Sequence, residues 1–226
     1  EKSFIIVIAL LTILAIGGCS KNEEPATNTT EISITPAPAE NTPMSIYKAV
    51  LQDKIPFVST DLNKDLHLSQ IKQAISSDEN IKARITKFAL VDLENDSIPE
   101  VILKLAVNDN EDYGYEVLSY IDGNVYGYTL WYRQFMDIKE DGTFSFSGGA
   151  SDYGFGRIIL SEDGYAIDEI TYSETIYDSD NTQNISFYVD KENATQEEFT
   201  KAINSQSDKK DVTWYDFTDE NMEKIL

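Results

Sequence analysis

From about residue 84 onwards the chain is a series of short strand-like segments separated by turn signals, and this pattern restricts the fold most. Apolar residues run almost continuously through 85–91 and 99–107, which predicts central strands buried on both faces. Asp122-Gly123, Asp141-Gly142 and Asp163-Gly164 lie between such segments, and Asp-Gly between apolar runs strongly predicts a hairpin. The later, mostly alternating segments are 115–121, 125–132, 143–146, 157–160, 165–172 and 185–189. We therefore expect a mainly antiparallel meander.

Helical patterns flank the strands on both sides. Residues 45–52 and 68–76 have apolar residues at helical spacing, and Thr195-Gln196-Glu197-Glu198 forms a capping-box pattern before a third helix. Residues 214–217 should be extended, and Thr218 should cap a last short helix. Helices at both ends with strands between them predict one α+β domain over residues 43–226. Its expected core contains Phe88, Leu90, Ile102, Leu103 and Leu105.

The N-terminal segment has the pattern of an export signal. Phe4 to Ile16 is an almost unbroken apolar run, shorter than the roughly 20 residues that span a bilayer and typical of a signal peptide. The following Ile16-Gly17-Gly18-Cys19 resembles the lipobox of bacterial lipoproteins. In that family the cysteine thiol receives a diacylglycerol and cleavage occurs just before it. The resemblance implies a signal peptide over 1–18, acyl chains such as palmitate on Cys19, and a membrane-anchored protein facing the extracytoplasmic side.

Residues 19–42 differ in composition from what precedes and follows. They are rich in Thr, Asn, Pro and Glu, and only Ile32 and Ile34 are large and apolar. Such a segment buries too little surface to offset the entropy of ordering it. We expect a disordered tether that holds the domain away from the membrane.

Charge and cysteine content exclude several kinds of partner and site. The chain has 40 acidic and 18 basic residues, a formal net charge of -22, which repels nucleic acid and anionic lipid headgroups and favours cations. Cys19 is the single cysteine, so the sequence given forms no intramolecular disulfide and no Cys-based zinc site.

Motifs for catalysis are missing from the sequence. His67 is the only histidine, and its polar, helix-flanking position predicts a surface residue. There is no phosphate-binding loop, dinucleotide fingerprint or nucleophile elbow. The glycine-rich stretch 147–156 is predicted to be a long hairpin loop, with an anion-binding nest as the weaker alternative. We therefore nominate no catalytic residue.

One acidic segment, residues 92–100, stands out between the two most apolar strands. It resembles the Asp-x-Asp-x-Asp-Gly-x-x-Asp/Glu calcium loop of many exported bacterial proteins. Two departures weaken the likeness, because Glu94 replaces a shorter Asp and Ser97 replaces the glycine of the sharp turn. The resemblance implies a structural Ca²⁺ whose ligands are Asp92, Glu94, Asp96, the carbonyl of Ile98, and Glu100. The alternative is an acidic turn facing water.

The stretch from residue 45 to 226 also resembles a group of uncharacterised lipoproteins from clostridia and related Gram-positive bacteria. The resemblance is carried by 47–51, 88–101, 122–128, 141–144 and 210–215. That group has no established activity, so the likeness implies localisation and a single domain and adds no catalytic residue.

Two hypotheses for function follow. The first is a non-enzymatic binding or interaction module at the cell envelope, with an envelope glycan or protein as partner. Eleven of the 13 tyrosines lie between Tyr113 and Tyr188, and an exposed aromatic row would suit either ligand, although strand packing is the first explanation for them. The second is an envelope hydrolase of glycosidase type that uses two carboxylates. A cleft holding two acidic residues in unequal environments, about 5 to 10 Å apart, would favour the second.

Overall fold

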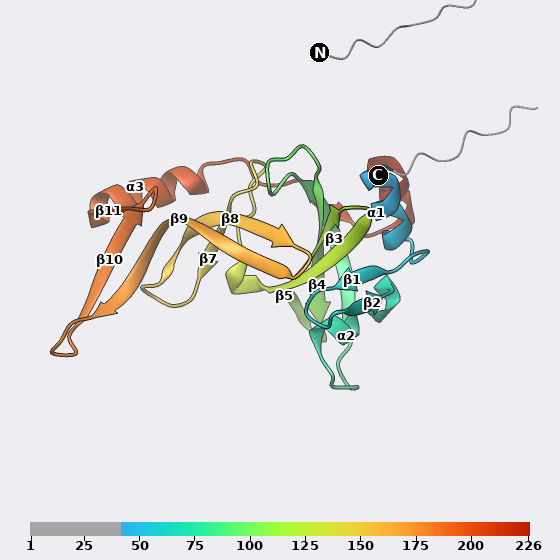
Figure 1. Ribbon diagram of the computed structural model, residues 1–226, viewed down its shortest axis with the longest axis horizontal. Helices are drawn as coiled ribbons and strands as arrows, with labels where there is room; N and C mark the ends of the chain where they lie inside the picture. Colours follow the sequence, from blue (N-terminus) through green and yellow to red (C-terminus); the bar gives the residue numbers. More distant parts are fainter. Residues whose placement is uncertain (1–41) are drawn as a thin grey trace, which may run out of the picture. The chain divides into compact units, whose positions relative to one another are not determined.

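Two β-sheets, each built mainly from antiparallel hairpins, form the framework of residues 42–226, the part of the chain that the computed structural model describes (Figure 1). Together with short helices they give an α+β fold, as predicted. The sequence predicted one sheet, whereas the structure has two. Cys19, the signal peptide 1–18 and nearly all of the tether 19–42 lie outside the described residues.

The large sheet contains seven strands in the order β12-β3-β4-β5-β6-β1-β2. Every pairing in it is antiparallel except that of β1 with β6, which is parallel and joins only Val58 to Tyr126 and Ser59 to Gly127. The sequence missed β1 and β2 because three-residue strands show no periodicity. The strands are β1 (Phe57–Ser59), β2 (Lys64–Leu66), β3 (Ala83–Val91), β4 (Glu100–Val107), β5 (Asn110–Ile121), β6 (Asn124–Trp131) and β12 (Tyr215–Asp216).

The small sheet contains five antiparallel strands in the order β11-β10-β9-β8-β7. Helix α3 (Gln196–Ser207) lies along it, and Phe199 of that helix contacts the rings of Tyr153 and Phe187 (Figure 1). The strands are β7 (Phe144–Ser147), β8 (Tyr153–Ser161), β9 (Gly164–Tyr177), β10 (Gln183–Val189) and β11 (Glu192–Ala194).

The remaining helices pack mainly on the large sheet. Helix α1 (Pro43–Leu51) lies beside α4 (Asp219–Ile225), and Lys48 Nζ is 2.6 Å from Glu223 Oε2 (Figure 1). The helix predicted over 68–76 is divided into a 3-10 turn, η1 (Leu68–Gln70), and α2 (Lys72–Ile75). A second 3-10 turn, η2 (Tyr132–Gln134), follows β6. None of the helices within 42–226 has the length and apolarity needed to cross a membrane.

The core lies on both faces of the large sheet, because β4 is buried on both sides as predicted. Phe88, Leu103 and Leu105 pack towards α1, α2 and α4, whereas Ile102 faces Ile158 and other residues of the small sheet. Four of the five predicted core residues, Phe88, Ile102, Leu103 and Leu105, are fully buried. Leu90 is only partly buried, which corrects its assignment to the centre of the core.

The three Asp-Gly signals each mark a chain reversal. Asp122 (φ 46°) and Gly123 (φ 94°) form the two-residue loop between β5 and β6, and both adopt the positive φ that this hairpin requires. Between β8 and β9 the loop is Glu162–Asp163, and Gly164 already pairs with Ser161. Asp141-Gly142 reverses the chain before β7, but its first arm joins the sheet only through an isolated bridge.

Candidate functional site

The predicted calcium loop connects β3 to β4, where the sequence placed it. Ser97, which replaces the expected glycine, has a φ of 74°. The serine therefore adopts the left-handed conformation that glycine usually supplies. Asn95 is also left-handed, with a φ of 60°. The glycine substitution thus does not prevent the sharp turn.

Two aspartates of this loop bind its own backbone. Asp92 Oδ1 and Oδ2 accept hydrogen bonds from the N–H groups of Asp96 and Ser97, at 3.0 and 2.9 Å. Asp96 Oδ1 accepts one from the N–H of Ile98 at 2.8 Å. These bonds satisfy backbone donors that the turn leaves without partners. The loop is therefore held closed by carboxylate-to-backbone contacts.

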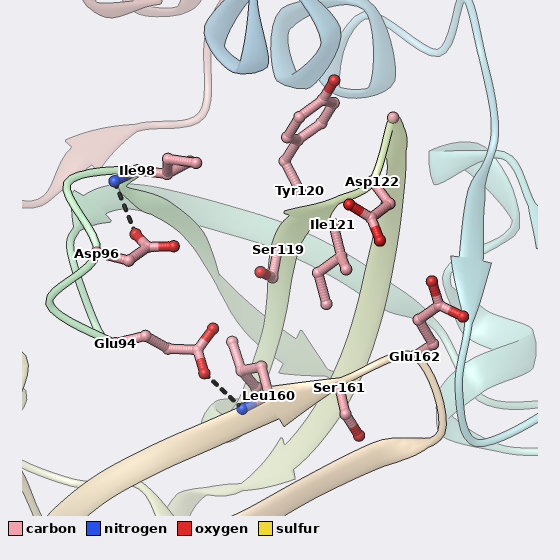
Figure 2. Close-up of a pocket in the computed structure, with 11 residues that line it drawn as sticks. Glu94, Asp96, Ile98, Ser119, Tyr120, Ile121, Asp122, Leu160, Ser161 and Glu162 are labelled. Carbon is pink, nitrogen blue, oxygen red and sulfur yellow. Dashed lines mark hydrogen bonds between the residues drawn. The ribbon is translucent and has the colours of Figure 1, made fainter. Parts of the chain in front are cut away.

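Glu94 connects the loop to the other sheet. Its Oε1 accepts a hydrogen bond of 2.9 Å from the N–H of Leu160, at the end of β8 (Figure 2). Strand β8 is an internal strand of the small sheet, so this contact crosses from one sheet to the other. Glu94 thus has a structural partner outside the loop, which sequence reasoning had not foreseen.

Glu100 is buried, with 2 % of its surface exposed. Its Oε2 accepts a 2.8 Å hydrogen bond from the N–H of Leu93, and the hydroxyl of Ser119 lies 3.4 Å from Oε1. Burial raises the pKa of Glu100 to about 8, with a further upward contribution from Glu94, Asp96 and Asp92, although the bond from Leu93 acts in the opposite direction. Burial therefore disfavours the charged carboxylate that a cation ligand requires.

The structure brings the five predicted ligands onto one loop but gives their carboxylates separate partners. Within residues 42–226 no group of three or more His, Cys, Asp or Glu side chains is arranged to hold a metal ion. For Ile98, the backbone N–H is bonded to Asp96. Binding of Ca²⁺ would require these carboxylates to converge on one point, which they do not do in the described residues. The calcium hypothesis stays a prediction.

Beside the loop lies a groove of about 770 Å³ that sequence reasoning did not find. Its walls come from the β3–β4 loop, the β5–β6 turn and the β8–β9 turn (Figure 2). We call it the acidic groove, because four of its lining residues are acidic and, in the described part of the chain, none of the lining residues is Lys or Arg. The lining residues are Glu94, Asp96, Ile98, Ser119, Tyr120, Ile121, Asp122, Gly123, Leu160, Ser161 and Glu162.

The acidic groove combines negative charge with apolar surface. Glu94, Asp96, Asp122 and Glu162 surround Ile98, Ile121 and Leu160 (Figure 2). Like charges gathered in a concave site give a strong negative potential, which attracts cations. The apolar side chains give any bound molecule a surface from which water can be displaced. Two walls of the groove could be recognised in the sequence as the turns at Asp122-Gly123 and Asp163-Gly164. Only the folded chain shows that these turns lie beside the β3–β4 loop.

Two other candidates from the sequence have structural explanations. His67 is partly exposed and its Nδ1 lies 3.7 Å from Asp53 Oδ1, which fits the predicted surface residue. In the glycine-rich stretch the N–H groups of Gly148 and Gly149 both donate to the carbonyl of Asp152. Donors used in this way are not free to hold an anion. A hairpin does form here, as predicted, but the loop is shorter than expected: only residues 148–152 connect β7 to β8, and residues 153–156 already belong to β8.

The tyrosine-rich region serves packing in large part. Tyr115, Tyr126 and Tyr128 are buried between the two sheets. Tyr172 of β9 and Tyr188 of β10 stack on each other across the strands, with ring centroids 4.5 Å apart. Tyr132, Tyr153 and Tyr177 are the tyrosines among the exposed large side chains of the described residues. The structural explanation therefore accounts for many of the eleven tyrosines.

Comparisons of this chain with protein-family models, with curated proteins and with solved structures found no match. The resemblance to clostridial lipoproteins therefore stays a sequence-based expectation.

Proposed function

We propose that this chain is a lipid-anchored protein on the extracytoplasmic side of a bacterial membrane, whose globular part is a non-enzymatic binding module for a cationic ligand. The observation that carries the proposal is the acidic groove, where four carboxylates from three loops line one concave site. The lipobox-like Ile16-Gly17-Gly18-Cys19 supports the anchor. The net charge of -22 makes nucleic acid an unsuitable partner and favours positively charged ligands.

For some of the carboxylates that line the groove, their placement favours a role in ligand binding over a structural role. Glu94 and Asp96 hold backbone groups in place, whereas Asp122 and Glu162 lie on turns, where the Glu162 carboxylate interacts with the hydroxyl of Tyr126. Mutual repulsion among four like charges costs free energy unless a cation offsets it. A cation in the groove would remove this cost and would gain apolar contact with Ile121 and Leu160.

Thermal unfolding in the presence of cations tests the proposal. The probes are Ca²⁺, Mg²⁺ and the linear polyamine spermine, each added at constant ionic strength. At tenfold excess over the dissociation constant, one bound cation should stabilise the protein by about 1.4 kcal/mol, or a few degrees in melting temperature. Asp122→Asn/Glu162→Gln should lose this shift, because it removes groove charge without breaking the bonds that close the β3–β4 loop.

The matched control is Asp190→Asn/Glu192→Gln, which changes the net charge equally on the turn between β10 and β11, away from the groove. It should respond to cations as the wild type does. A third variant, Asp92→Asn, separates the calcium loop from the groove, because Asp92 is a predicted calcium ligand that does not line the groove. Equal melting temperatures of the wild type with and without all three cations would contradict both hypotheses.

The alternative, a carboxylate-based hydrolase, has one observation in its favour. Burial raises the pKa of Glu100, whereas Asp96 of the same loop is exposed, so the loop contains carboxyl groups in two different environments. However, Glu100 is 2 % exposed and is not among the residues that line the groove. An acid must reach the bond that it protonates. The geometry therefore supports binding more strongly than hydrolysis.

A further inference from the structure

The seam where β1 pairs with β6 contains two buried side-chain atoms without a hydrogen-bond partner in residues 42–226, Ser59 Oγ and Glu116 Oε1. Both residues are fully buried. A buried polar atom without a partner destabilises a fold, so native proteins contain few of them. Two such atoms at one seam indicate that at least one of these two side chains has a role besides packing.

The two atoms flank the same glycine. Ser59 pairs with Gly127 in the parallel ladder. A Cβ on Gly127 would lie 2.5 Å from Glu116 Oε1 and 2.5 Å from the ring of Phe57. Side chains two apart on a strand share a face, so Ser59 lies on the same side as Phe57 and Glu116. Because Gly127 has no side chain, the Glu116 carboxyl has space to lie beside β1.

Few bonds hold the β1–β2 hairpin, residues 57–66, to the rest of the large sheet. Besides the two-residue ladder, the N–H and hydroxyl of Thr60 donate to the Gly127 carbonyl at 3.0 and 2.9 Å. The N–H of Thr129 donates to Asp61 Oδ2 at 3.2 Å. Phe57 adds apolar contact in the core. Leu66 of β2 is also buried in this core, so the hydrogen bonds that join the hairpin to β6 lie close to Glu116, while apolar contacts anchor both of its strands.

The surroundings of Glu116 favour its neutral form. The pKa of Glu116 is raised to about 8, mainly by burial; the bond from the Thr129 hydroxyl to Oε2, at 2.8 Å, acts to lower it, and the charge of Asp61 acts to raise it. Among the described residues, Asp61 is the charged group whose field acts on Glu116. The residues of β4 and β6 that face Glu116 are Leu103, Gly127 and Thr129, and none of them titrates. A neutral carboxyl also carries an O–H donor that an ionised one lacks.

We propose that a proton on Glu116 holds the β1–β2 hairpin against β6, and that the seam opens as this proton is lost. In the closed state the carboxyl is neutral and shielded from water. In the open state water reaches it, and it ionises as an ordinary glutamate does. The group thus binds a proton when closed and releases it when open, so rising pH shifts the equilibrium towards opening.

The direction of the pH effect on opening, and the pH range in which it occurs, follow from proton linkage. An ordinary glutamate has a pKa of 4.5 on the scale that gives about 8 for closed Glu116. Below 4.5 both states hold the proton, and above about 8 neither does, so the stabilisation is present at acidic pH and is lost between these values. Within this range one proton is released per opening, which makes the opening equilibrium constant rise about tenfold per pH unit.

Hydrogen exchange of the full chain between pH 5 and 9 tests the proposal. The reporters are the amides of Thr60 and Thr129, which bridge the seam. After correction for intrinsic exchange chemistry, their protection should fall by up to about tenfold per pH unit and level off near pH 8, while amides of β4 should not follow. In Glu116→Gln, which keeps the shape without the titration, the protection of Thr60 and Thr129 should not depend on pH.

Two results would overturn the proposal: pH-independent protection of both amides in the wild type, or the same pH dependence in Glu116→Gln. If Glu116→Gln does not fold, carboxyl ¹³C titration of the wild type decides instead. The resonance of Glu116 should titrate above pH 7, and titration below about pH 5 would show that no proton is held at the seam.

Discussion

Single residues with unusual surroundings show where this fold tolerates least change. Ser97 takes a left-handed conformation at a position where glycine is the usual choice, and Glu116 is a fully buried carboxyl. The conformation of Ser97 and the burial of Glu116 cannot be predicted from the amino-acid type alone, because both are caused by the surrounding residues. Gly127 is the clearest case, since its neighbours fill the space that a side chain would need.

Gly127→Ala should destabilise the protein by about 1–3 kcal/mol, the usual cost of an added methyl in a packed core. The new Cβ would lie 2.5 Å from the ring of Phe57, and that ring is buried. Urea unfolding at one pH measures the effect. Gly148→Ala is the matched control, because the nearest atom to its Cβ would be 3.7 Å away. Equal midpoints for the two variants would contradict the close packing at the seam.

At the scale of elements, strong local patterns predicted structure well and weak ones failed. The capping box at Thr195, the Asp122-Gly123 hairpin and the apolar β4 were all found where the sequence placed them. The helix over 68–76 was wrong in part, because its middle is broken at Ile71. The acidic loop was located correctly, but the groove beside it was missed, because its walls meet only through the packing of one sheet on another.

Thr195→Ala should destabilise the protein by about 1 kcal/mol by removing the cap of α3. Thr195 accepts from the N–H of Glu198 at 3.3 Å, and Glu198 Oε2 accepts from the N–H of Thr195 at 2.8 Å. Thr200→Ala in the same helix is the control, since the hydroxyl of Thr200 only donates to the Gln196 carbonyl. Its expected effect is a few tenths of a kcal/mol. The midpoints of urea unfolding compare the two, and a Thr195→Ala midpoint equal to that of Thr200→Ala would argue against the cap.

The whole molecule combines a folded domain with an N-terminal segment of different character. The sequence predicts export, lipid attachment at Cys19 and a tether, all of which concern residues outside the described structure. For the domain, the pattern of apolar residues, turns and helix caps was enough to predict an α+β fold, but it did not specify that the strands divide into two sheets. That division depends on long-range contacts such as those of Ile158 and Leu160 with the large sheet.

Cys19→Ala should release the protein from the membrane or leave an uncleaved precursor, because the predicted diacylglycerol would be attached to the thiol of this cysteine. Two acyl chains give stable anchoring, whereas apolar contact by the domain alone should not. Fractionation of a bacterial host that expresses the wild type or the variant measures the distribution. A variant that is processed and stays in the membrane fraction like the wild type would place the anchor elsewhere.

The position of β12 at the edge of the large sheet has a consequence for the order of folding during synthesis. Tyr215 and Asp216 pair with Phe88 and Lys87 of β3, and α4 then packs beside α1. The chain emerges from the ribosome with its N-terminal part first. Strands β3 to β6 can therefore pair early, but one edge of their sheet and part of their helical cover are supplied by residues 215–225. Until that stretch has emerged, Phe88 lacks the aromatic contacts of Tyr215 and Phe217. The incomplete sheet then has to be protected from aggregation with other chains.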